Sequence, residues 1–375
     1  MAEHGQSKLV MLAAGGTAGH LFPAQALAEE LVGRGFRIHL LTDERVREYG
    51  KSFPAEQVHI IPAATITPSA PLRVPGQLLR LYGGYRQARK LIAEHRADAV
   101  VGFGGYPSLP PLFAASKLRV PRLVHEQNSV LGRANLLLVR QGSTVATSFD
   151  TVSNLPKDAK ATLTGNPVRA IVKSVAGAAY PSMEKDIHLL VFGGSQGARF
   201  FADMMPGVAA ALPEDLRKRL HITQQCREED MARTTEAYRA TGIRADLNPF
   251  FMDMPQRMAA SHLVVCRSGA SSIAELGVVG RPAILVPLPH ALDNDQLRNA
   301  ESFSKAGAGW VQPQATIETA GFAAFLTGLL SNPSGLKEAA AAALRHGKPD
   351  AARRLADLLQ SIIAACVADL ETFEA

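Results

Sequence analysis

Short apolar runs alternate along the chain with longer stretches in which apolar residues recur at helical spacing. The runs have the length of buried parallel strands. Helical patterns lie between most of them, and two more, 335–346 and 350–370, end the chain. This alternation predicts α/β architecture with doubly wound parallel sheets. The expected strands are 9–14, 38–42, 99–103, 123–125, 144–147, 187–192, 220–224, 263–266 and 283–286.

Two of these runs end in glycine-rich turns of the same design. The first turn is Gly15-Gly-Thr-Ala-Gly19 and the second is Gly193-Gly-Ser-Gln-Gly197, and helical patterns at 24–31 and 198–212 follow them. A strand that passes through glycines into a helix directs backbone N–H groups and a positive helix end at one point, where phosphates bind well. The turns lie about one domain length apart. We therefore expect two Rossmann-like domains that face a nucleotide-linked substrate across a cleft.

Composition supports a two-domain globular protein. The chain has 375 residues, of which 47% are hydrophobic and 20% charged. The expected domains are 1–165 and 166–349, and the last helical segment is 350–375. We expect neither a signal peptide nor a membrane-spanning run. The three widely spaced cysteines favour neither a disulfide framework nor a zinc site, and they suggest a reducing cytoplasm.

Charge and motif spacing exclude several other classes. The net charge of +6 favours an anionic partner. A nucleic acid is not that partner, because the single Trp gives no stacking platform and no basic cluster accompanies a reading motif. The spacing Gly15-Gly-x-x-Gly19 departs from the dinucleotide-binding fingerprint. Asp43 also lies farther along the chain than the acidic residue that binds the ribose in that fingerprint, which follows the glycines by about 20 positions. No Gly-Lys-(Ser/Thr) follows either turn, which excludes a Walker phosphate loop.

Seven ordered motifs give the chain a specific resemblance. From about Leu9 to the last helix, the sequence resembles the MurG family of bacterial N-acetylglucosamine transferases. The motifs are Gly15-Gly-Thr-Ala-Gly-His-Leu-Phe-Pro23, Gly104-Gly-Tyr-Pro-Ser108, His125-Glu-Gln-Asn128, Thr164-Gly-Asn-Pro-Val-Arg169, Gly193-Gly-Ser-Gln-Gly-Ala-Arg199, Cys266-Arg-Ser-Gly-Ala-Ser-Ser272 with Glu275, and Asp295-Gln296 with Asn299-Ala300.

The resemblance implies a glycosyltransferase of the GT-B type. Its N-terminal domain would hold the acceptor, its C-terminal domain would hold most of UDP-N-acetylglucosamine, and the segment 350–375 would cross back to the first domain. The 4-hydroxyl of the muramoyl sugar of undecaprenyl-linked lipid I would attack C1 of the donor. UDP would leave with inversion, and the β-1,4 linkage of lipid II would form. We expect no cofactor, because the UDP-sugar is a substrate. We also expect no protein-bound metal, since Asp293-Asn-Asp295 is interpreted as donor-loop structure.

Catalysis needs a proton acceptor for the attacking hydroxyl. Matching the family motif, His20 is the natural candidate, because an imidazole titrates near cytoplasmic pH. The alternative for His20 is capping of the helix or contact with a phosphate or sugar oxygen. Glu126 and His125 are further catalytic candidates that could share the proton transfer.

The resemblance also assigns donor contacts. The second turn and the segment after 263–266 would hold the diphosphate, Glu275 would bind the ribose hydroxyls, and amide side chains would bind sugar hydroxyls. Ala18 replaces a usual glycine of the family, which costs about 1–2 kcal/mol if its φ is positive and little if φ is negative. The donor-binding candidates are Thr17, Ala18, Gly19, Asn128, Arg169, Ser195, Phe251, Arg267, Ala270, Ser271, Ser272, Glu275 and Gln296.

The acceptor side would use the first turn and a Gly/Pro-rich loop, with Gly16, Tyr106 and Ser108 as candidates. A lipid acceptor also requires contact with a bilayer, and no acidic residue occurs between Glu56 and Glu94. Basic and apolar side chains in that window suit an anionic membrane surface. We expect Leu78, Leu81, Tyr85 and Ala88 to face inward, Gly83-Gly84 to weaken the helix, and the membrane-facing residues to be Leu79, Arg80, Tyr82 and Arg86.

The family places such an enzyme peripherally on the cytoplasmic face of the bacterial inner membrane. There it serves peptidoglycan synthesis, cell shape and cell division, with other wall-synthesis proteins as partners. Two alternatives remain open. One is another UDP-sugar enzyme of the same fold, such as a sugar epimerase or a glycolipid synthase, and the motifs His125-Glu-Gln-Asn128 and Gly165-Asn-Pro-Val-Arg169 argue against it. The other is a scaffold that binds UDP-sugar or lipid without transfer, against which the retained His20, Glu275 and Gln296 argue.

Overall fold

The computed structural model describes residues 7–44, 53–65, 71–194, 198–289 and 292–374. The chain forms two compact units. Unit 1 contains Met1–Arg169 and Asp350–Ala375, and unit 2 contains Ala170–Pro349. The first unit thus extends four residues beyond the expected boundary at 165, and it includes the last helix of the chain.

Unit 1 is built on a seven-stranded sheet with the order β3-β2-β1-β4-β5-β6-β7. Every pairing in it is parallel. The order reverses beside β1, so loops after β1 and β4 meet at the carboxyl edge where ligands bind in such sheets. The strands are β1 (Leu9–Ala13), β2 (Arg37–Thr42), β3 (Gln57–Ile60), β4 (Ala99–Gly102), β5 (Arg122–Glu126), β6 (Thr144–Thr147) and β7 (Ala161–Leu163).

Helices cover both faces of this sheet because its strands are apolar on both sides. Val10 and Leu12 of β1 pack in the layer that contains α1 and α14, whereas Leu9 and Met11 pack in the layer that contains α2 and α3. The helices of unit 1 are α1 (Ala18–Gly33), α2 (Val74–Glu94), α3 (Leu109–Lys117), α4 (Arg133–Arg140) and α14 (Ala351–Glu374).

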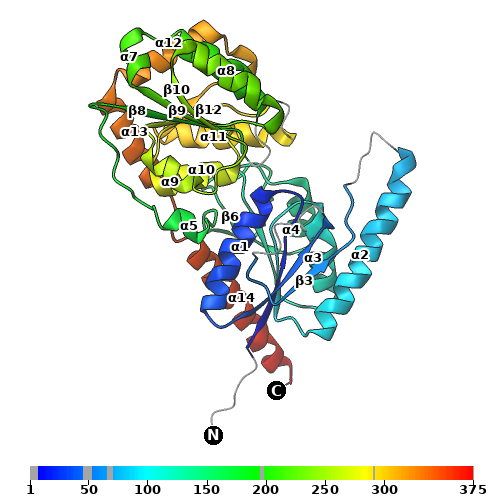
Figure 1. Cartoon of the computed structure of the whole chain (residues 1–375). Coiled ribbons are helices and arrows are strands. Elements are labelled where there is room, and N and C mark those ends of the chain that lie inside the picture. The colour runs from blue at the N-terminus through cyan, green and yellow to red at the C-terminus, as the bar shows by residue number, and fades with distance from the viewer. Residues whose placement is uncertain (1–6, 45–52, 66–70, 195–197, 290–291, 375) are drawn as a thin grey trace. The chain divides into compact units, whose positions relative to one another are not determined.

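The last helix completes the core of unit 1. In Figure 1, α14 lies beside α1, although the two are separated by most of the sequence. Leu355, Leu359 and Ile363 are buried in the layer beneath the sheet. Burial of each such side chain contributes about 1.5–3 kcal/mol. Arg34 at the end of α1 adds an ion pair to Asp357, with 2.7 Å between Nη1 and Oδ1.

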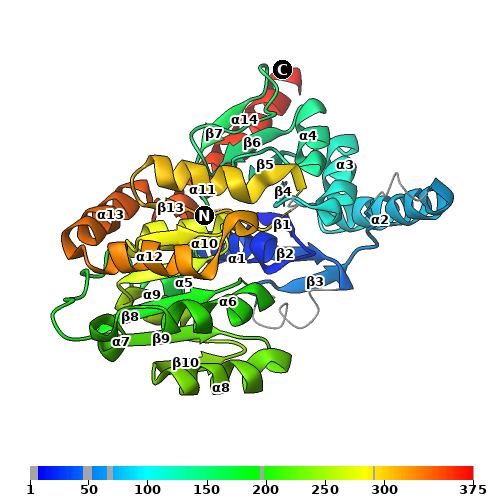
Figure 2. The same ribbon diagram turned by 90° about the horizontal axis from the view of Figure 1, so that it is seen from above.

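Helix α2 is continuous and projects from the edge of unit 1 (Figures 1 and 2). The expected weakness at Gly83-Gly84 is wrong. Gly84 instead allows close approach, because a Cβ there would lie 2.1 Å from the Pro62 carbonyl oxygen. The expectation for Leu78 is also wrong, since it is 50% exposed. The helix turns its C-terminal half, around Ala88 and Ile92, onto the core.

Unit 2 repeats the same topology. Its six-stranded parallel sheet has the order β10-β9-β8-β11-β12-β13. The order reverses beside β8, so the loops after β8 and β11 meet at the carboxyl edge. The strands are β8 (Ile187–Phe192), β9 (Leu220–Gln225), β10 (Arg244–Asn248), β11 (Leu263–Cys266), β12 (Ala283–Leu285) and β13 (Gly309–Val311).

The core of unit 2 lies mainly between its sheet and the layer containing α6, α8 and α12, where Phe201, Tyr238 and Leu326 are buried. Helices α9 and α10 lie on the opposite face (Figure 1). The helices are α5 (Ala170–Lys173), α6 (Arg199–Ala210), α7 (Glu214–Arg219), α8 (Met231–Thr241), α9 (Met254–Ala260), α10 (Ala270–Val279), α11 (Asp295–Lys305), α12 (Thr319–Leu330) and α13 (Pro333–His346).

Candidate active site

The first glycine turn joins β1 to α1 and takes its unusual backbone conformation at one position. Gly16 has a φ of 85°, in the region that glycine adopts without strain. Thr17 is the extended N-cap residue, and Ala18 opens the helix. Helical φ is negative, so an alanine at position 18 costs little. Gly19 follows within the first turn of α1, where backbone N–H groups lack intrahelical acceptors.

The ring of His20 is oriented by this turn. Its Nδ1 lies 3.1 Å from the carbonyl oxygen of Gly15 and 3.5 Å from Thr17 Oγ1. A carbonyl only accepts, so Nδ1 carries the proton that it donates to Gly15, and the neutral ring has its lone pair on Nε2. The side chain is half-buried. This tautomer is the one that a base acting through Nε2 requires.

The loop after β4 packs against the same ring. Gly104 and Gly105 have φ values of 86° and 70°. A Cβ on Gly104 would lie 3.5 Å from His20 Nε2, and one on Gly105 would lie 3.3 Å from His20 Cε1. Two consecutive glycines therefore let this backbone close against the imidazole.

The two expected acceptor-side residues of this loop, Tyr106 and Ser108, differ in how deeply they are buried. Tyr106 is half-buried and packs on the core layer beneath α3. Ser108 is fully buried, and its Oγ lies 2.8 Å from the Gly104 oxygen and 3.0 Å from the Ala13 oxygen. Ser108 thus joins the loop after β4 to the end of β1. The acceptor-side role expected of it remains a prediction.

His125 is held inside the fold by hydrogen bonds, and the proton transfer expected of it remains a prediction. The side chain is fully buried at the end of β5. Its Nε2 donates to the Gly165 oxygen at 3.0 Å, and its Nδ1 accepts from Gln127 Nε2 at 3.1 Å. Burial lowers the pKa of His125 to about 4, so the ring is neutral at cytoplasmic pH. It positions the segment around Gly165.

Glu126 is also buried, and its carboxylate organises the loop after β5. Oε1 accepts from the Asn128 backbone N–H at 3.0 Å, while Oε2 accepts from the Gly132 N–H at 2.9 Å and Asn135 Nδ2 at 2.7 Å. Burial raises the pKa of this carboxyl, and these donors act in the opposite direction. Both oxygens accept hydrogen bonds, so Glu126 positions this loop, and the proton transfer expected of it remains a prediction. Half-buried Asn128 is held beside it.

Asn135 belongs to this arrangement although the sequence analysis did not select it. It is buried on α4, and its amide donates to Glu126. A polar residue on the buried face of an amphipathic helix is the signal that could have identified it.

Arg169 follows Gly165 by four residues in the sequence. Its guanidinium stacks over the Phe22 ring of α1 at 3.9 Å from the ring centroid. The nucleotide contact expected of Arg169 remains a prediction.

The second glycine turn connects β8 to α6. Gly194 has a φ of 83°, as Gly16 does in the first turn. Ser195 lies outside the described residues, so its diphosphate role remains a prediction. Ala198 is the extended N-cap residue of α6. Both units therefore direct the start of a helix at the carboxyl edge of their own sheet.

The start of α10 is the second place in unit 2 where an anion site is predicted. Ala270, Ser271 and Ser272 are its first residues, and their N–H groups face the turn after β11. The Ser271 hydroxyl is buried and has no hydrogen-bond partner among the described residues. A buried polar group without a partner carries a desolvation cost that a ligand oxygen would relieve. Half-buried Glu275 follows one helical turn later.

Arg267 holds the loop beside this helix, and the donor contact expected of it remains a prediction. Its side chain is buried and donates to the carbonyl oxygens of Val286 and Pro287 at 3.1 and 3.2 Å. Nη2 donates to Gln314 Oε1 at 2.6 Å. Its guanidinium therefore fixes the segment that follows β12.

Gln296 lies at the start of α11 with its side chain directed to the same segment. Its Oε1 accepts from the Leu288 N–H at 3.0 Å, and the hydrogen bond expected from its amide nitrogen to a sugar hydroxyl remains a prediction. The Asp295 carboxylate, in the first turn of α11, accepts from the Gln296 N–H at 2.7 Å. The sequence analysis missed Ser268, which is buried and donates to the Gln296 carbonyl at 2.8 Å.

Phe251 follows β10 and is buried under the Arg257 guanidinium, 4.2 Å from its ring centroid. Its aromatic ring thus packs within the fold, and the expected backbone contact to the nucleotide remains a prediction.

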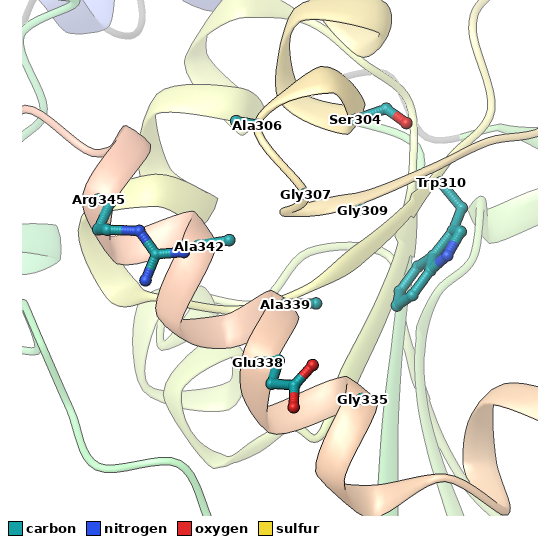
Figure 3. Close-up of a pocket in the computed structure, with 10 residues that line it drawn as sticks. All are labelled: Ser304, Ala306, Gly307, Gly309, Trp310, Gly335, Glu338, Ala339, Ala342 and Arg345. Carbon is teal, nitrogen blue, oxygen red and sulfur yellow. The ribbon is translucent and has the colours of Figure 1, made fainter.

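A separate surface hollow of about 450 Å³ lies between α13 and the α11–β13 connection (Figure 3). Its walls contain Trp310, Glu338 and Arg345 and none of the predicted site residues.

The two Rossmann-like units and their paired glycine turns define a glycosyltransferase of the GT-B fold. Residues 10–147 match the N-terminal domain of glycosyltransferase family 28, and residues 188–355 match its C-terminal domain. A UDP-N-acetylglucosamine–N-acetylmuramyl-(pentapeptide) pyrophosphoryl-undecaprenol N-acetylglucosamine transferase of Mesorhizobium japonicum is 50% identical over 361 residues, which are 94% of this chain and 95% of that protein. The chain belongs to this family, the MurG transferases.

Other comparisons agree. The Brucella suis transferase of the same name is 48% identical, over 95% of this chain and 94% of that protein. The crystal structure of Acinetobacter baumannii MurG superimposes with a TM-score of 0.78 at 28% identity, over 94% and 99% of the two chains. A UDP-N-acetylglucosamine 2-epimerase superimposes with a TM-score of 0.64 at 12% identity, which indicates a shared fold alone.

Proposed function

We propose that this protein transfers N-acetylglucosamine from UDP-N-acetylglucosamine to the 4-hydroxyl of the muramoyl sugar of lipid I, forming lipid II. The observation that carries the proposal is 50% identity to a transferase of that name along nearly the whole of both chains. The oriented His20 of unit 1 and the anion site of unit 2 supply the chemistry that the reaction needs.

The reaction is a displacement with inversion. The acceptor hydroxyl oxygen forms a bond to C1 of the donor sugar, its proton passes to His20 Nε2, and the C1–oxygen bond to UDP breaks with its electrons on the diphosphate. Backbone N–H groups at the start of α10 stabilise the charge on the leaving group. No protein-bound cofactor takes part in this scheme. Ser195, Thr17, Gly19 and Asn128 are further proposed contacts of the donor, and Gly16 of the acceptor.

Glu275 is proposed to bind the ribose hydroxyls of the donor. A carboxylate accepts from two hydroxyls at once, and hydrogen bonds to a charged group are worth about 1.5–3 kcal/mol. Glu275→Ala is therefore expected to raise KM for UDP-N-acetylglucosamine about 10- to 100-fold, with a smaller change in kcat. The assay follows radiolabel from the donor into a short-chain lipid I analogue.

Glu301→Ala is the matched control, because Glu301 is an exposed glutamate on α11 that pairs with Arg298 of the same helix. Its KM should equal that of the unchanged protein. Donor binding without any label in a lipid-linked disaccharide would overturn the transferase function and favour a binding scaffold. Transfer with an unchanged KM in Glu275→Ala would leave the reaction in place and remove only the ribose contact.

We also propose that α2 contacts the cytoplasmic leaflet of the inner membrane. None of the described helices is long and apolar enough to cross a bilayer. Leu79 is 72% exposed and Tyr82 is 57% exposed, and Arg80 and Arg86 are exposed on the same helix. Apolar tips that enter the interface together with basic residues beside anionic lipid form a peripheral contact. Other wall-synthesis proteins are proposed as partners at that surface.

Vesicle flotation tests this contact. With vesicles containing about one-third anionic lipid, Arg80→Gln with Arg86→Gln should weaken binding by about tenfold or more, since each basic residue contributes about 1 kcal/mol. Leu79→Ser with Tyr82→Ser should weaken binding to the same vesicles at both low and high salt, because salt does not screen the insertion of apolar side chains. Leu137→Ser is the control, because Leu137 is an equally apolar exposed residue on α4 of the same unit. Equal binding by all variants would place the membrane surface elsewhere.

A further inference from the structure

Three histidines of unit 1 converge at a place that the transfer reaction does not use. His39 lies in β2, His59 lies in the neighbouring strand β3, and His95 is the C-cap residue of α2. One ring nitrogen from each lies within 4.8 Å of the other two. The carboxyl end of α2 leads back to the start of β4, whereas the glycine turn with His20 follows the carboxyl end of β1. The cluster is therefore at a different edge of the sheet from the candidate active site.

The spacing of two of the rings is close to that of ligands in a tetrahedral metal centre. His39 Nδ1 and His59 Nε2 are 3.3 Å apart and share a hydrogen bond, which an ion bound between them would replace. Two nitrogens bound to one ion at about 2.0–2.1 Å in tetrahedral geometry would be separated by about 3.4 Å. The ring centroids are 5.2, 4.7 and 5.7 Å apart, and the rings are inclined at 50°, 79° and 46° to one another. The rings are thus inclined to one another instead of stacked, with one nitrogen of each in the same small region.

The carboxylate of Glu56 lies near the ring nitrogen of His39 that is not bonded to His59. His39 is fully buried, and its Nε2 has no hydrogen-bond partner among the described residues. Glu56 Oε2 lies 3.9 Å from this nitrogen, beyond hydrogen-bond distance. If Nδ1 binds a metal, Nε2 carries the proton and can donate it to Glu56. That carboxylate–histidine–metal order orients ligands in many protein metal sites.

From this geometry we propose that His39, His59 and His95 bind one zinc ion, with Glu56 holding the His39 ring. Neutral imidazole selects late first-row divalent ions, among which zinc accepts three nitrogens in tetrahedral geometry. Water completes the coordination. The ion would link the edge strand β3 to β2 and to the end of α2, so it would fix the base of the helix that we assign to the membrane.

Unit 2 contains a second group of histidines that serves as an internal control. The rings of His188, His221 and His262 are stacked, with interplanar angles of 25° and 16°. His262 Nδ1 accepts from the His188 N–H, and its Nε2 lies 3.0 Å from the Ser182 oxygen. His221 bonds to Asp186 at 3.1 Å. These nitrogens are bonded to groups outside the three rings, whereas the nitrogens of the unit 1 cluster lie close to one another, so this second group should not bind the ion.

The test is zinc titration of the full-length protein, prepared without a polyhistidine tag and freed of metal with a chelator. Calorimetry should give one zinc ion per chain, and the Tm should rise with zinc concentration. Co²⁺ in the same site should show the visible absorption of tetrahedral cobalt. His59→Gln and His95→Gln replace the two more accessible ligands, and each should abolish saturable binding, the Tm rise and the cobalt spectrum.

Two further variants make the outcome decisive. Glu56→Gln should keep the site but weaken zinc binding by about 10- to 100-fold. His221→Gln should bind zinc like the unchanged protein. The proposal is overturned if His59→Gln and His95→Gln retain one-to-one binding, if His221→Gln loses it, or if the unchanged protein binds no zinc. Circular dichroism of each variant shows whether it is folded, and transfer activity is not needed for any of these measurements.

Discussion

Replacement of His20 by alanine is expected to lower kcat for transfer by about 10²- to 10⁴-fold, the range for loss of a positioned general base. The Nδ1–Gly15 hydrogen bond holds the lone pair of this ring on Nε2, and alanine removes the proton acceptor without changing the glycine turn. KM for UDP-N-acetylglucosamine should change little, because the proposed ribose contact of Glu275 and the proposed diphosphate contacts at the starts of α6 and α10 belong to unit 2 and are retained. Steady-state kinetics with the labelled donor measure both constants.

His221→Ala is the control for this variant. His221 is a partly exposed histidine of β9 that pairs with Asp186, so its loss should leave kcat unchanged. A kcat for His20→Ala close to that of the unchanged protein would assign proton acceptance to another group. A large rise in KM for the donor with little change in kcat would instead give His20 a binding role, the alternative that the sequence analysis left open.

Glu126→Ala is expected to destabilise unit 1 strongly. The change leaves the N–H groups of Asn128 and Gly132 and the amide of Asn135 without their acceptor. At about 1 kcal/mol or more for each unpaired donor, the free energy of unfolding should fall by at least about 3 kcal/mol. That loss corresponds to a decrease in Tm of about 6–12 °C for a unit of this size. Thermal unfolding followed by circular dichroism measures it.

Glu94→Ala provides the comparison, because Glu94 is an exposed residue of α2 whose partner is Lys90 at 3.5 Å. Exposed pairs of this kind contribute about 0.3–0.5 kcal/mol to the free energy of unfolding. The Tm of Glu94→Ala should therefore fall by about 1–2 °C at most. Equal Tm values for Glu126→Ala and Glu94→Ala would show that the loop after β5 does not depend on the buried carboxylate.

The sequence predicted the interior of both sheets and failed at their edges. The expected strands correspond to β1, β2, β4, β5 and β6 in unit 1 and to β8, β9, β11 and β12 in unit 2. The missed strands are β3, β7, β10 and β13, which are the edges in the observed orders. An edge strand pairs on one side and is only partly covered, so its residues are mixed in polarity, as in Arg244–Asn248. Such a segment has no continuous apolar run to recognise.

The sequence located the elements that carry the candidate residues but not the direction of their side chains. The glycine turns and the order of motifs predicted that His20 and Glu275 lie at the start of, or within, helices that follow sheet strands, and the structure places them in α1 and α10, because strand ends and helix starts follow from local pattern. Burial of Ser108, His125 and Arg267 depends on neighbours distant in sequence, so local spacing could not reveal it. The histidine cluster was equally hidden, since His59 lies in an unrecognised edge strand.

The return of α14 to unit 1 has a consequence for how the protein is made. All of unit 2 is inserted between Arg169 and Asp350 of unit 1. During translation, residues 1–169 leave the ribosome with the apolar face of α1 uncovered, while unit 2 is complete before α14 has been synthesised. Leu355, Leu359 and Ile363 then close the first core last. The apolar face of α1, which is synthesised early, therefore stays exposed in the nascent chain until α14 has been synthesised and covers it.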